Sequence, residues 1–291
     1  MAHLAKIAPA LFVLLWSTGF IGSKLGAPYI EPMAFLTVRF AAVLPILFIL
    51  GLFWVKSWPN DKKAIGHCIV TGMLVHGIYL GGVFWAIKQG MPAGASAIIV
   101  GLQPVLTAIF AVGMIGEVIS RKHWISMAIG LSGLGLVLGP KFDLAGSGIT
   151  LVTISVVFFS VIAISVGTVY QKRFVPNTDL LAATFWQYVG ALLVTTPLSL
   201  FETWQITWSG ELIVALAWLV LVLSIGAIML LMLLIRQGAV SQVASLFYLV
   251  PVATAIESYF LFGETLSMIQ IAGMALVVGA VLMIRAAPKR T

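Results

Sequence analysis

Two charged side chains lie inside long apolar stretches of this chain, Arg39 in the segment 32–53 and Glu257 in the segment 239–262. A charged side chain costs about 3 kcal/mol or more at the centre of a membrane, so such residues are usually paired or functional. The Arg39 guanidinium can bind a carboxylate through two parallel hydrogen bonds. The Glu257 carboxyl can hold an amino group or bind a proton. Alternatively, both residues pair with each other or with backbone carbonyls, and the sequence leaves the role of Arg39 open.

His76 and Tyr79 form a polar patch in the segment 64–86. Because they are three residues apart, they lie on one face of a helix, and the imidazole can hydrogen bond a ligand or respond to pH near neutrality. We expect further aromatic and hydrogen-bonding residues near the middle of other apolar segments to line the same site: Trp16, Ser17, Gln103, Phe158, Ser160, Trp186, Gln187, Ser245 and Tyr248. Each of these residues alone is typical of helix packing. Together they suit amphipathic, zwitterionic or weakly hydrophobic ligands, because a phosphorylated ligand would need several cationic side chains.

The elements that carry these residues are long and apolar. Of the 291 residues, 61% are hydrophobic and 9% are charged, which is too few ionisable groups to cover a water-soluble protein of this size. A helix needs about 20 apolar residues to cross a bilayer, and we predict ten such helices: 7–26, 32–53, 64–86, 91–114, 124–140, 146–170, 179–200, 211–235, 239–262 and 266–285. Their connections are short, and lipid requires every backbone group to be paired, so the sequence predicts an all-α integral membrane protein.

Basic residues predict how the helices are oriented. Lys and Arg accumulate in the cytoplasmic loops of membrane proteins. With the N-terminus inside, 12 of the 16 basic residues lie on the cytoplasmic side, three lie outside, and Arg39 lies within a segment. We therefore expect a multi-pass protein of an inner or plasma membrane with both termini in the cytoplasm. The net charge of +7 then reflects contact with anionic lipid headgroups, and it gives no indication of nucleic-acid binding.

Two stretches about half a chain length apart are nearly the same. "PVLTAIFAVGMIGE" (Pro104–Glu117) and "PVATAIESYFLFGE" (Pro251–Glu264) are identical at seven of fourteen positions. More weakly, "TVRFAA" aligns with "TFWQYVG", which places Arg39 opposite Gln187. The chain is therefore predicted to contain the same group of helices twice.

The repeat predicts two units of five helices, at residues 1–140 and 141–291. Because five is odd, the second unit enters the membrane from the opposite face, so the two units are inverted repeats. Inverted repeats are typical of secondary transporters, in which two halves exchange conformations around a central site. Pro104 and Pro251 each remove a helix hydrogen bond, and we expect them to act as hinges.

These motifs resemble the EamA-type branch of the drug/metabolite transporter superfamily. The resemblance is carried by the doubled Pro to Gly-Glu signature, by "LLWSTGFIGSK" (Leu14–Lys24) and by "VRF" (Val38–Phe40). It implies a basket of ten helices around a central cavity, with the fifth and tenth helices as outer support. It also implies export of small metabolites by alternating access, with aromatic or other neutral amino acids as the first choice of substrate. Drugs or purine-like metabolites are the alternative within the same superfamily.

Other classes of protein receive less support from the sequence. Walker, His-Glu-x-x-His and Gly-x-Ser-x-Gly motifs are absent from the sequence, so we do not expect an enzyme. A channel would need a continuous polar pore, and the sequence contains no filter-like run of polar residues, which argues against a channel. We expect no cofactor and no metal, and the partners to be a small-molecule substrate, membrane lipids and, if transport is coupled, protons through Glu257 or His76. A uniporter, a monomer and a homodimer all remain compatible with the sequence.

Overall fold

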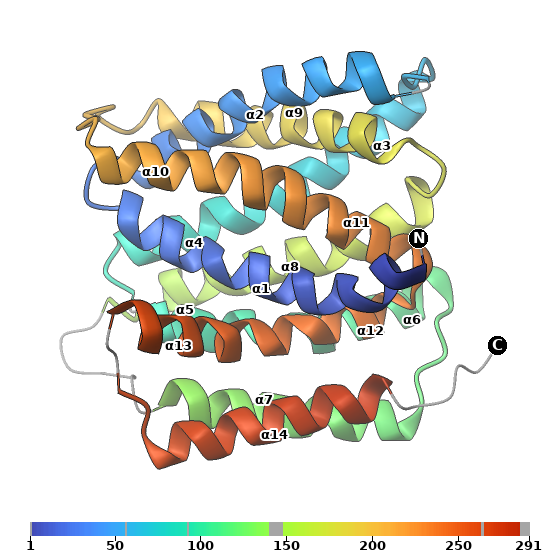
Figure 1. Ribbon diagram of the computed structural model, residues 1–291, viewed down its shortest axis with the longest axis vertical. Helices are drawn as coiled ribbons and strands as arrows, with labels where there is room; N and C mark the ends of the chain where they lie inside the picture. Colours follow the sequence, from blue (N-terminus) through green and yellow to red (C-terminus); the bar gives the residue numbers. More distant parts are fainter. Residues whose placement is uncertain (1, 56, 92, 140–147, 263–264, 286–291) are drawn as a thin grey trace.

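The computed structural model describes residues 2–55, 57–91, 93–139, 148–262 and 265–285, and this part of the chain is helical without a strand (Figure 1). The prediction of an all-α protein is confirmed for these residues. In chain order the elements are α1 (Ala2–Gly26), α2 (Pro32–Trp54), α3 (Lys62–Gly72), η1 (Met73–Ile78), α4 (Tyr79–Lys88), α5 (Ala93–Val100), α6 (Gln103–Ile115), α7 (Arg121–Leu138), α8 (Leu151–Phe174), α9 (Leu180–Ser199), α10 (Gly210–Trp218), η3 (Leu219–Ala227), α11 (Ile228–Gln237), α12 (Val240–Ser245), η4 (Leu246–Tyr248), α13 (Leu249–Phe262) and α14 (Met268–Arg285).

Several of these elements join into continuous apolar segments. Seven segments of the described chain are long and apolar enough to cross a membrane: Pro32–Trp54, Lys62–Lys88, Ala95–Ile115, Leu151–Phe174, Leu180–Ser199, Gly210–Gln237 and Val240–Leu261. Two shorter apolar helices, Ile7–Ser23 and Met268–Ile284, lie within α1 and α14. The one remaining predicted segment, 124–140, corresponds to α7. The count of ten spanning helices therefore stays a prediction. The sixth segment, expected at 146–170, is observed at Leu151–Phe174.

Side-chain caps fix where some of the helices begin. The Ser120 hydroxyl accepts a hydrogen bond from the backbone N–H of His123 at the start of α7. At the start of α8, Thr150 and Thr153 each accept a hydrogen bond from the other's backbone N–H and so form a capping box. Each of these oxygens satisfies an N–H group that has no partner within the helix, and one such cap contributes about 1 kcal/mol.

The helices are irregular at places that correspond in the two halves of the sequence. The π-helical turns η1 (Met73–Ile78) and η3 (Leu219–Ala227) overlap in the register that aligns Arg39 with Gln187. A second kind of irregularity precedes each repeated proline, as a turn between α5 and α6 and as the 3-10 turn η4 between α12 and α13. Such interruptions leave backbone groups outside the regular hydrogen-bond ladder, and they often lie at functional sites.

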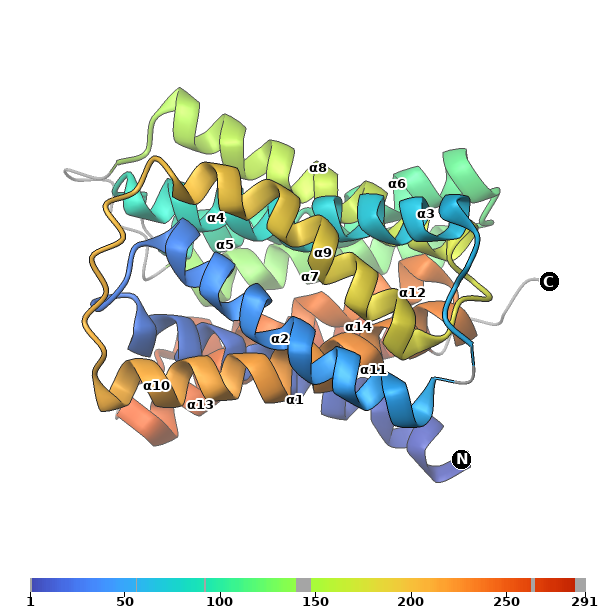
Figure 2. The same ribbon diagram turned by 90° about the horizontal axis from the view of Figure 1, so that it is seen from above.

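The bundle has two ends that carry different connections. α1 begins and α14 ends at one of them, next to the α2–α3, α6–α7 and α8–α9 connections, and we call it the termini end (Figure 1, right). The opposite end carries the connections Ala27–Glu31, Gln89–Met91 and 200–209, and we call it the mouth end (Figure 1, left). Figure 2 shows α2 and α9 crossing the bundle, with α10 and α11 on one side and α3 and α4 on the other.

α7 and α14 pack against each other along one edge of the bundle (Figure 1). Their backbones meet at two glycines, because a Cβ on Gly133 would lie 2.8 Å from the Gly273 oxygen, and a Cβ on Gly273 would lie 2.7 Å from the Gly133 oxygen. Small residues at such a crossing let two helices approach closely where lipid gives no hydrophobic driving force. Gln270 of α14 adds a hydrogen bond of 3.1 Å from its Nε2 to the Val137 oxygen.

Candidate binding cavity

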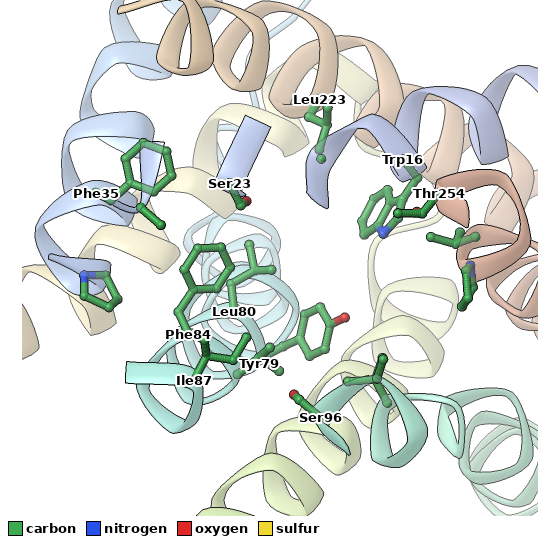
Figure 3. A pocket seen from close by; sticks show the side chains of 18 of the residues that line it. Trp16, Ser23, Phe35, Tyr79, Leu80, Phe84, Ile87, Ser96, Leu223 and Thr254 are labelled. Carbon is green, nitrogen blue, oxygen red and sulfur yellow. The ribbon is translucent and has the colours of Figure 1, made fainter. Parts of the chain in front are cut away.

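A cavity of about 1070 Å³ lies inside the bundle and is lined by helices from both halves of the chain. Figure 3 shows Trp16 and Thr254 on one side of its open centre, with Leu80, Phe84 and Tyr79 on another. Its rim includes residues of the mouth-end connections, so the cavity reaches that end of the bundle. A largely apolar pocket of this size with a few polar groups is typical of a small-molecule site.

Seven of the residues singled out from the sequence line this cavity: Trp16, Arg39, His76, Tyr79, Pro104, Tyr248 and Pro251. The first four carry either an aromatic ring or a polar group to the wall. The two prolines lie where the helices are interrupted, which brings irregular backbone next to the cavity. Tyr248 contributes its ring, because its hydroxyl donates to the Met127 oxygen of α7 at 3.2 Å.

Arg39 supplies a positive charge to the wall of the cavity. Its side chain is 6% exposed, and its Nε donates a hydrogen bond to Ser224 Oγ of η3 at 3.0 Å. Among the described residues, no carboxylate lies within ion-pair distance of the guanidinium. A buried cation without a counter-charge is costly, so the site favours an anionic group from a ligand. A pair between Arg39 and Glu257, which was one of the alternatives that the sequence left open, is not formed, because Glu257 contacts Ser17 instead.

His76 is held by α9 rather than by a group of its own helix. Its Nε2 lies 3.3 Å from Gln187 Oε1, and its ring stacks on Tyr188 with the centroids 4.9 Å apart. The Tyr188 hydroxyl in turn donates to the Ser224 backbone oxygen at 2.9 Å. Gln187 therefore lies behind the cavity wall and orients His76, instead of lining the cavity as we expected.

Trp16 belongs to an aromatic cluster between α1 and η4. Its ring is 5.2 Å from that of Phe12 and 5.1 Å from that of Phe247, the second pair being edge-to-face. Such pairs add about 0.5–1.5 kcal/mol beyond the area they bury. The cluster fixes Trp16 as one rigid wall of the cavity, opposite Tyr79 of α4 (Figure 3).

The remaining candidates from the sequence do not line the cavity: Ser17, Gln103, Phe158, Ser160, Trp186, Gln187, Ser245 and Glu257. Phe158 is 38% exposed and packs edge-to-face against the more exposed Phe159 on α8. Ser160 and Ser245 donate to backbone oxygens of their own helices. The physical reason is that depth in an apolar segment does not determine which side of the helix a residue occupies, since each residue turns by about 100°. Gln103, at the start of α6, is completely buried.

The rim contains an ion cluster that sequence reasoning missed. Lys88 Nζ lies 2.5 Å from Glu31 Oε1 and 3.6 Å from Glu202 Oε1. Glu31 Oε2 also accepts from Thr203 Oγ1 at 2.8 Å, while Glu202 accepts from the backbone N–H groups of the first turn of α2. Hydrogen bonds from Lys88 and Thr203 lower the pKa of Glu31 to about 2. Lys88 ends α4, whereas Glu31, Glu202 and Thr203 lie in two connections between helices. In the sequence, only their charge next to apolar segments could have marked the three charged residues.

Two charged side chains tie helices together at the termini end. Glu117, which ends the first copy of the repeated motif, accepts hydrogen bonds from the backbone N–H of Val240 at 3.0 Å and from the N–H and hydroxyl of Ser241. Lys172 donates to the backbone oxygens of Ile235, Arg236 and Gly238 at 2.6, 2.8 and 3.1 Å. Both side chains bind at the connection between α11 and α12, and the residues that line the cavity include none from this connection.

Known proteins resemble the chain over nearly its whole length. A model of the EamA-like transporter family matches it twice, at residues 5–139 and 151–286. "Uncharacterized inner membrane transporter YedA" of Escherichia coli (strain K12) is 27% identical over 97% of this chain and 91% of its own. "Probable amino-acid metabolite efflux pump" of Salmonella typhimurium is 23% identical over 92% and 90%. "S-adenosylmethionine uptake transporter" of Rickettsia prowazekii is 24% identical over 89% and 84%.

A solved structure has the same fold. It is described as "Crystal structure of protein", is 20% identical to this chain, and covers 96% of this chain and 95% of its own with a TM-score of 0.80. At this identity the likeness concerns the fold alone, so what the two proteins share is the arrangement of the helices.

Proposed function

Because the chain belongs to the EamA-like transporter family of the drug/metabolite transporter superfamily, we propose that it is a secondary transporter that exports neutral amino acids, aromatic ones above all. The protein would carry its solute between the two sides of the membrane by alternating access around the central cavity. The relatives named as an efflux pump and as an uptake transporter work in opposite directions by their names, so export is part of the proposal.

The observation that carries this proposal is a single uncompensated guanidinium in an aromatic cavity. Arg39 uses its Nε on Ser224, and its two terminal nitrogens remain to bind a carboxylate bidentately. Trp16, Tyr79 and Phe84 present aromatic faces and edges for a hydrophobic side chain. A neutral amino acid offers both a carboxylate and an apolar side chain, whereas a phosphorylated solute would need more than one cation.

Alternating access is supported by irregularities that recur in the two halves. We propose that residues 1–140 and 141–291 are inverted repeats, so that η1 and η3 are equivalent turns on opposite sides of the cavity. The mouth end is open and the termini end is held shut by Glu117 and Lys172. If both termini are cytoplasmic, as the basic residues predict, this arrangement is an outward-facing state.

A larger metabolite that combines a carboxylate with a purine ring is the second candidate. The volume of about 1070 Å³ exceeds what a single amino acid fills, and one relative is named as a transporter of S-adenosylmethionine. The carboxylate would bind Arg39 in the same way, and the ring would lie against the aromatic wall. The two candidates therefore differ in what occupies the rest of the cavity.

A counterflow panel in proteoliposomes tests the proposal. Liposomes containing the purified protein are loaded with unlabelled phenylalanine, and the entry of labelled phenylalanine is competed with phenylalaninamide, adenine, S-adenosylmethionine and glucose. We expect saturable entry that phenylalanine competes and that phenylalaninamide, which lacks the carboxylate, does not. Competition by S-adenosylmethionine at lower concentration than phenylalanine would favour the second candidate. Entry that does not saturate would overturn the transporter mechanism in favour of a channel.

A further inference from the structure

The carboxyl of Glu257 lies at the seam between α1 and α13, which come from different halves of the chain. Its Oε1 is 2.6 Å from the hydroxyl oxygen of Ser17, a residue that is completely buried. Its Oε2 is also buried, and no donor of the described chain reaches it. An ionised carboxylate has two acceptor oxygens that both need donors, and leaving one of them buried and unpaired is costly.

The number of protons at this contact indicates that the carboxyl is protonated. Ser17 Oγ lies within hydrogen-bond distance of two acceptors, Glu257 Oε1 at 2.6 Å and the Leu14 backbone oxygen at 2.8 Å. A hydroxyl has only one proton to donate, so an ionised Glu257 and Leu14 would compete for it. A protonated Glu257 removes the conflict, because its O–H donates to Ser17 Oγ while Ser17 donates to Leu14.

This contact is connected to the cavity wall. Thr254 lies one turn before Glu257 on α13, lines the cavity, and donates to the Ser17 backbone oxygen at 3.5 Å. Trp16, the neighbour of Ser17, lines the cavity as well. Ionisation of Glu257 would leave Ser17 with one proton for two acceptors and weaken the seam next to these wall residues. A change in the charge of Glu257 should therefore alter the contacts of Trp16 and Thr254, two residues that line the cavity.

The ionisable groups around this seam belong to the four elements that pack on α13, namely α1, η4, α7 and α14. They are His3, Lys6 and Lys24 on α1, Tyr248 on η4, Arg121, Lys122 and His123 on α7, Arg285 on α14, and Tyr259 on α13 itself. Arg121, Lys122, His123 and Arg285 lie at the termini end of their helices, whereas Glu257 is near the opposite end of α13. Lys24, whose side chain lies outside the described set, is two turns along α1 from Ser17 and needs a control of its own.

The equivalent seam in the first half has no carboxyl. In the register of the repeat, Glu257 corresponds to Phe110, and Ser17 corresponds to Ser165. Ser165 Oγ is 3.4 Å from the Gln103 backbone oxygen, so the serine is kept while the acid is replaced by an aromatic ring. The acid therefore serves a task that the fold itself does not require in both halves.

We propose that Glu257 is the proton-binding residue of this protein and that solute export is coupled to proton entry. The inference rests on the proposed function. The carboxylate takes up one proton from water on the mouth side to become a neutral carboxyl, which donates to Ser17 and closes the α1–α13 seam. The proton leaves to water on the other side once the cavity opens there, and no other bond is formed or broken.

Infrared difference spectroscopy of the purified full-length protein tests the proton site without a solute. Spectra at stepped pH follow the C=O stretching band of a protonated carboxyl in the wild type, in Glu257→Gln and in Ser17→Ala. We expect a band that disappears at high pH, is absent from Glu257→Gln and shifts in frequency in Ser17→Ala, while the exposed control Glu211→Gln keeps it. If the band is the same in Glu257→Gln as in the wild type, the proposal is overturned. If Glu257→Gln does not fold, an unshifted band in Ser17→Ala overturns it in the same way.

Transport in proteoliposomes tests the coupling. An outward proton gradient of one pH unit, with the interior of the liposomes acidic, should raise the accumulation of labelled phenylalanine inside them about tenfold if one proton leaves for each solute that enters. In Glu257→Gln the gradient should no longer change the accumulation, while Lys24→Gln and Glu211→Gln respond as the wild type does. An unchanged gradient response in Glu257→Gln, or its loss in Lys24→Gln alone, would contradict the assignment. Absence of counterflow for every solute in the wild type would instead count against the proposed function, and the infrared result stays independent of it.

Discussion

Arg39 on α2 donates from its Nε to the hydroxyl of Ser224 on the π-helical turn η3, over 3.0 Å. Gln187 on α9, which aligns with Arg39 in the repeat, makes the corresponding contact of 3.3 Å with His76 on the π-helical turn η1. The equivalent positions are thus in contact in both halves, but Arg39 donates from a charged nitrogen, whereas Gln187 contacts His76 through its neutral amide oxygen. The cavity wall is therefore built from a symmetric pair of contacts with an asymmetric charge.

Replacing Arg39 tests whether that charge binds the solute. Arg39→Gln puts the residue of the second half into the first, so the contact with Ser224 can persist while the cation is lost. Losing a charged hydrogen-bond pair of about 1.5–3 kcal/mol should raise the KM for phenylalanine roughly ten- to a hundredfold in counterflow. Lys62→Gln, an exposed change at the start of α3, serves as the control. A wild-type KM in Arg39→Gln would assign Arg39 a purely structural role.

His76 offers a second test of the wall. His76→Ala removes the hydrogen bond to Gln187 and the stack on Tyr188. We expect phenylalanine to compete about tenfold more weakly in counterflow, because one polar and aromatic wall of the cavity is lost. Since an unpaired buried Gln187 also costs about 1–3 kcal/mol, the thermal stability of His76→Ala and of His76→Ala/Gln187→Ala should be compared. Unchanged competition would return His76 to a packing role.

How much of this wall was predictable depends on which physical feature marks a residue. Arg39, His76 and Trp16 were predicted because polar or large aromatic groups are conspicuous in an apolar segment. Phe158 and Ser245 were placed by depth alone, and depth gives no information about the helix face. Widened turns such as η1 shift the register of all residues that follow, so a regular helical wheel cannot give the lining.

The fold was predictable further than the site. The lengths of the apolar segments predicted where the helices lie. The repeated motif indicated that helices would be interrupted near Pro104 and Pro251. The rim cluster was not predictable, because Glu31 and Lys88 are far apart in sequence and meet only through the packing of α2 on α4. Loop charges of this kind were counted for orientation alone, and their pairing required the tertiary structure.

Glu117 should hold the termini end closed. Glu117→Ala removes the acceptor for the first N–H groups of α12, and a loss of more than about 1.4 kcal/mol shifts a two-state equilibrium more than tenfold. We therefore expect a cysteine in place of the completely buried Thr107 on α6 to react with a maleimide about tenfold faster from the termini side in this variant. Glu211→Gln at the other end is the control. An unchanged labelling rate would show that Glu117 does not keep the termini end closed.

The rim cluster predicts a dependence of stability on pH. The pKa of Glu31 is lowered from 4.5 to about 2, so its ionised form stabilises the fold fully above about pH 4.5, and this contribution is lost as the pH falls toward 2. Glu31→Gln should therefore lower the melting temperature by a few degrees at neutral pH and by much less near pH 3. In a Lys88→Gln background the neutral-pH difference should shrink, because the main partner is gone. A difference that is independent of pH would contradict this origin.

The inversion of the two halves is the claim on which the transport mechanism depends, and one labelling experiment tests it directly. Gln89 in "IKQG" and Gln237 in "IRQG" are equivalent positions of the repeat, and both are exposed. Single cysteines at these positions, in a background where the buried native Cys68 is replaced by alanine, are treated in intact cells with a membrane-impermeant maleimide. We predict that Gln89→Cys is labelled from outside and that Gln237→Cys is labelled only after permeabilisation. Labelling of both cysteines from the same side would contradict the inverted repeat and, with it, alternating access around this cavity.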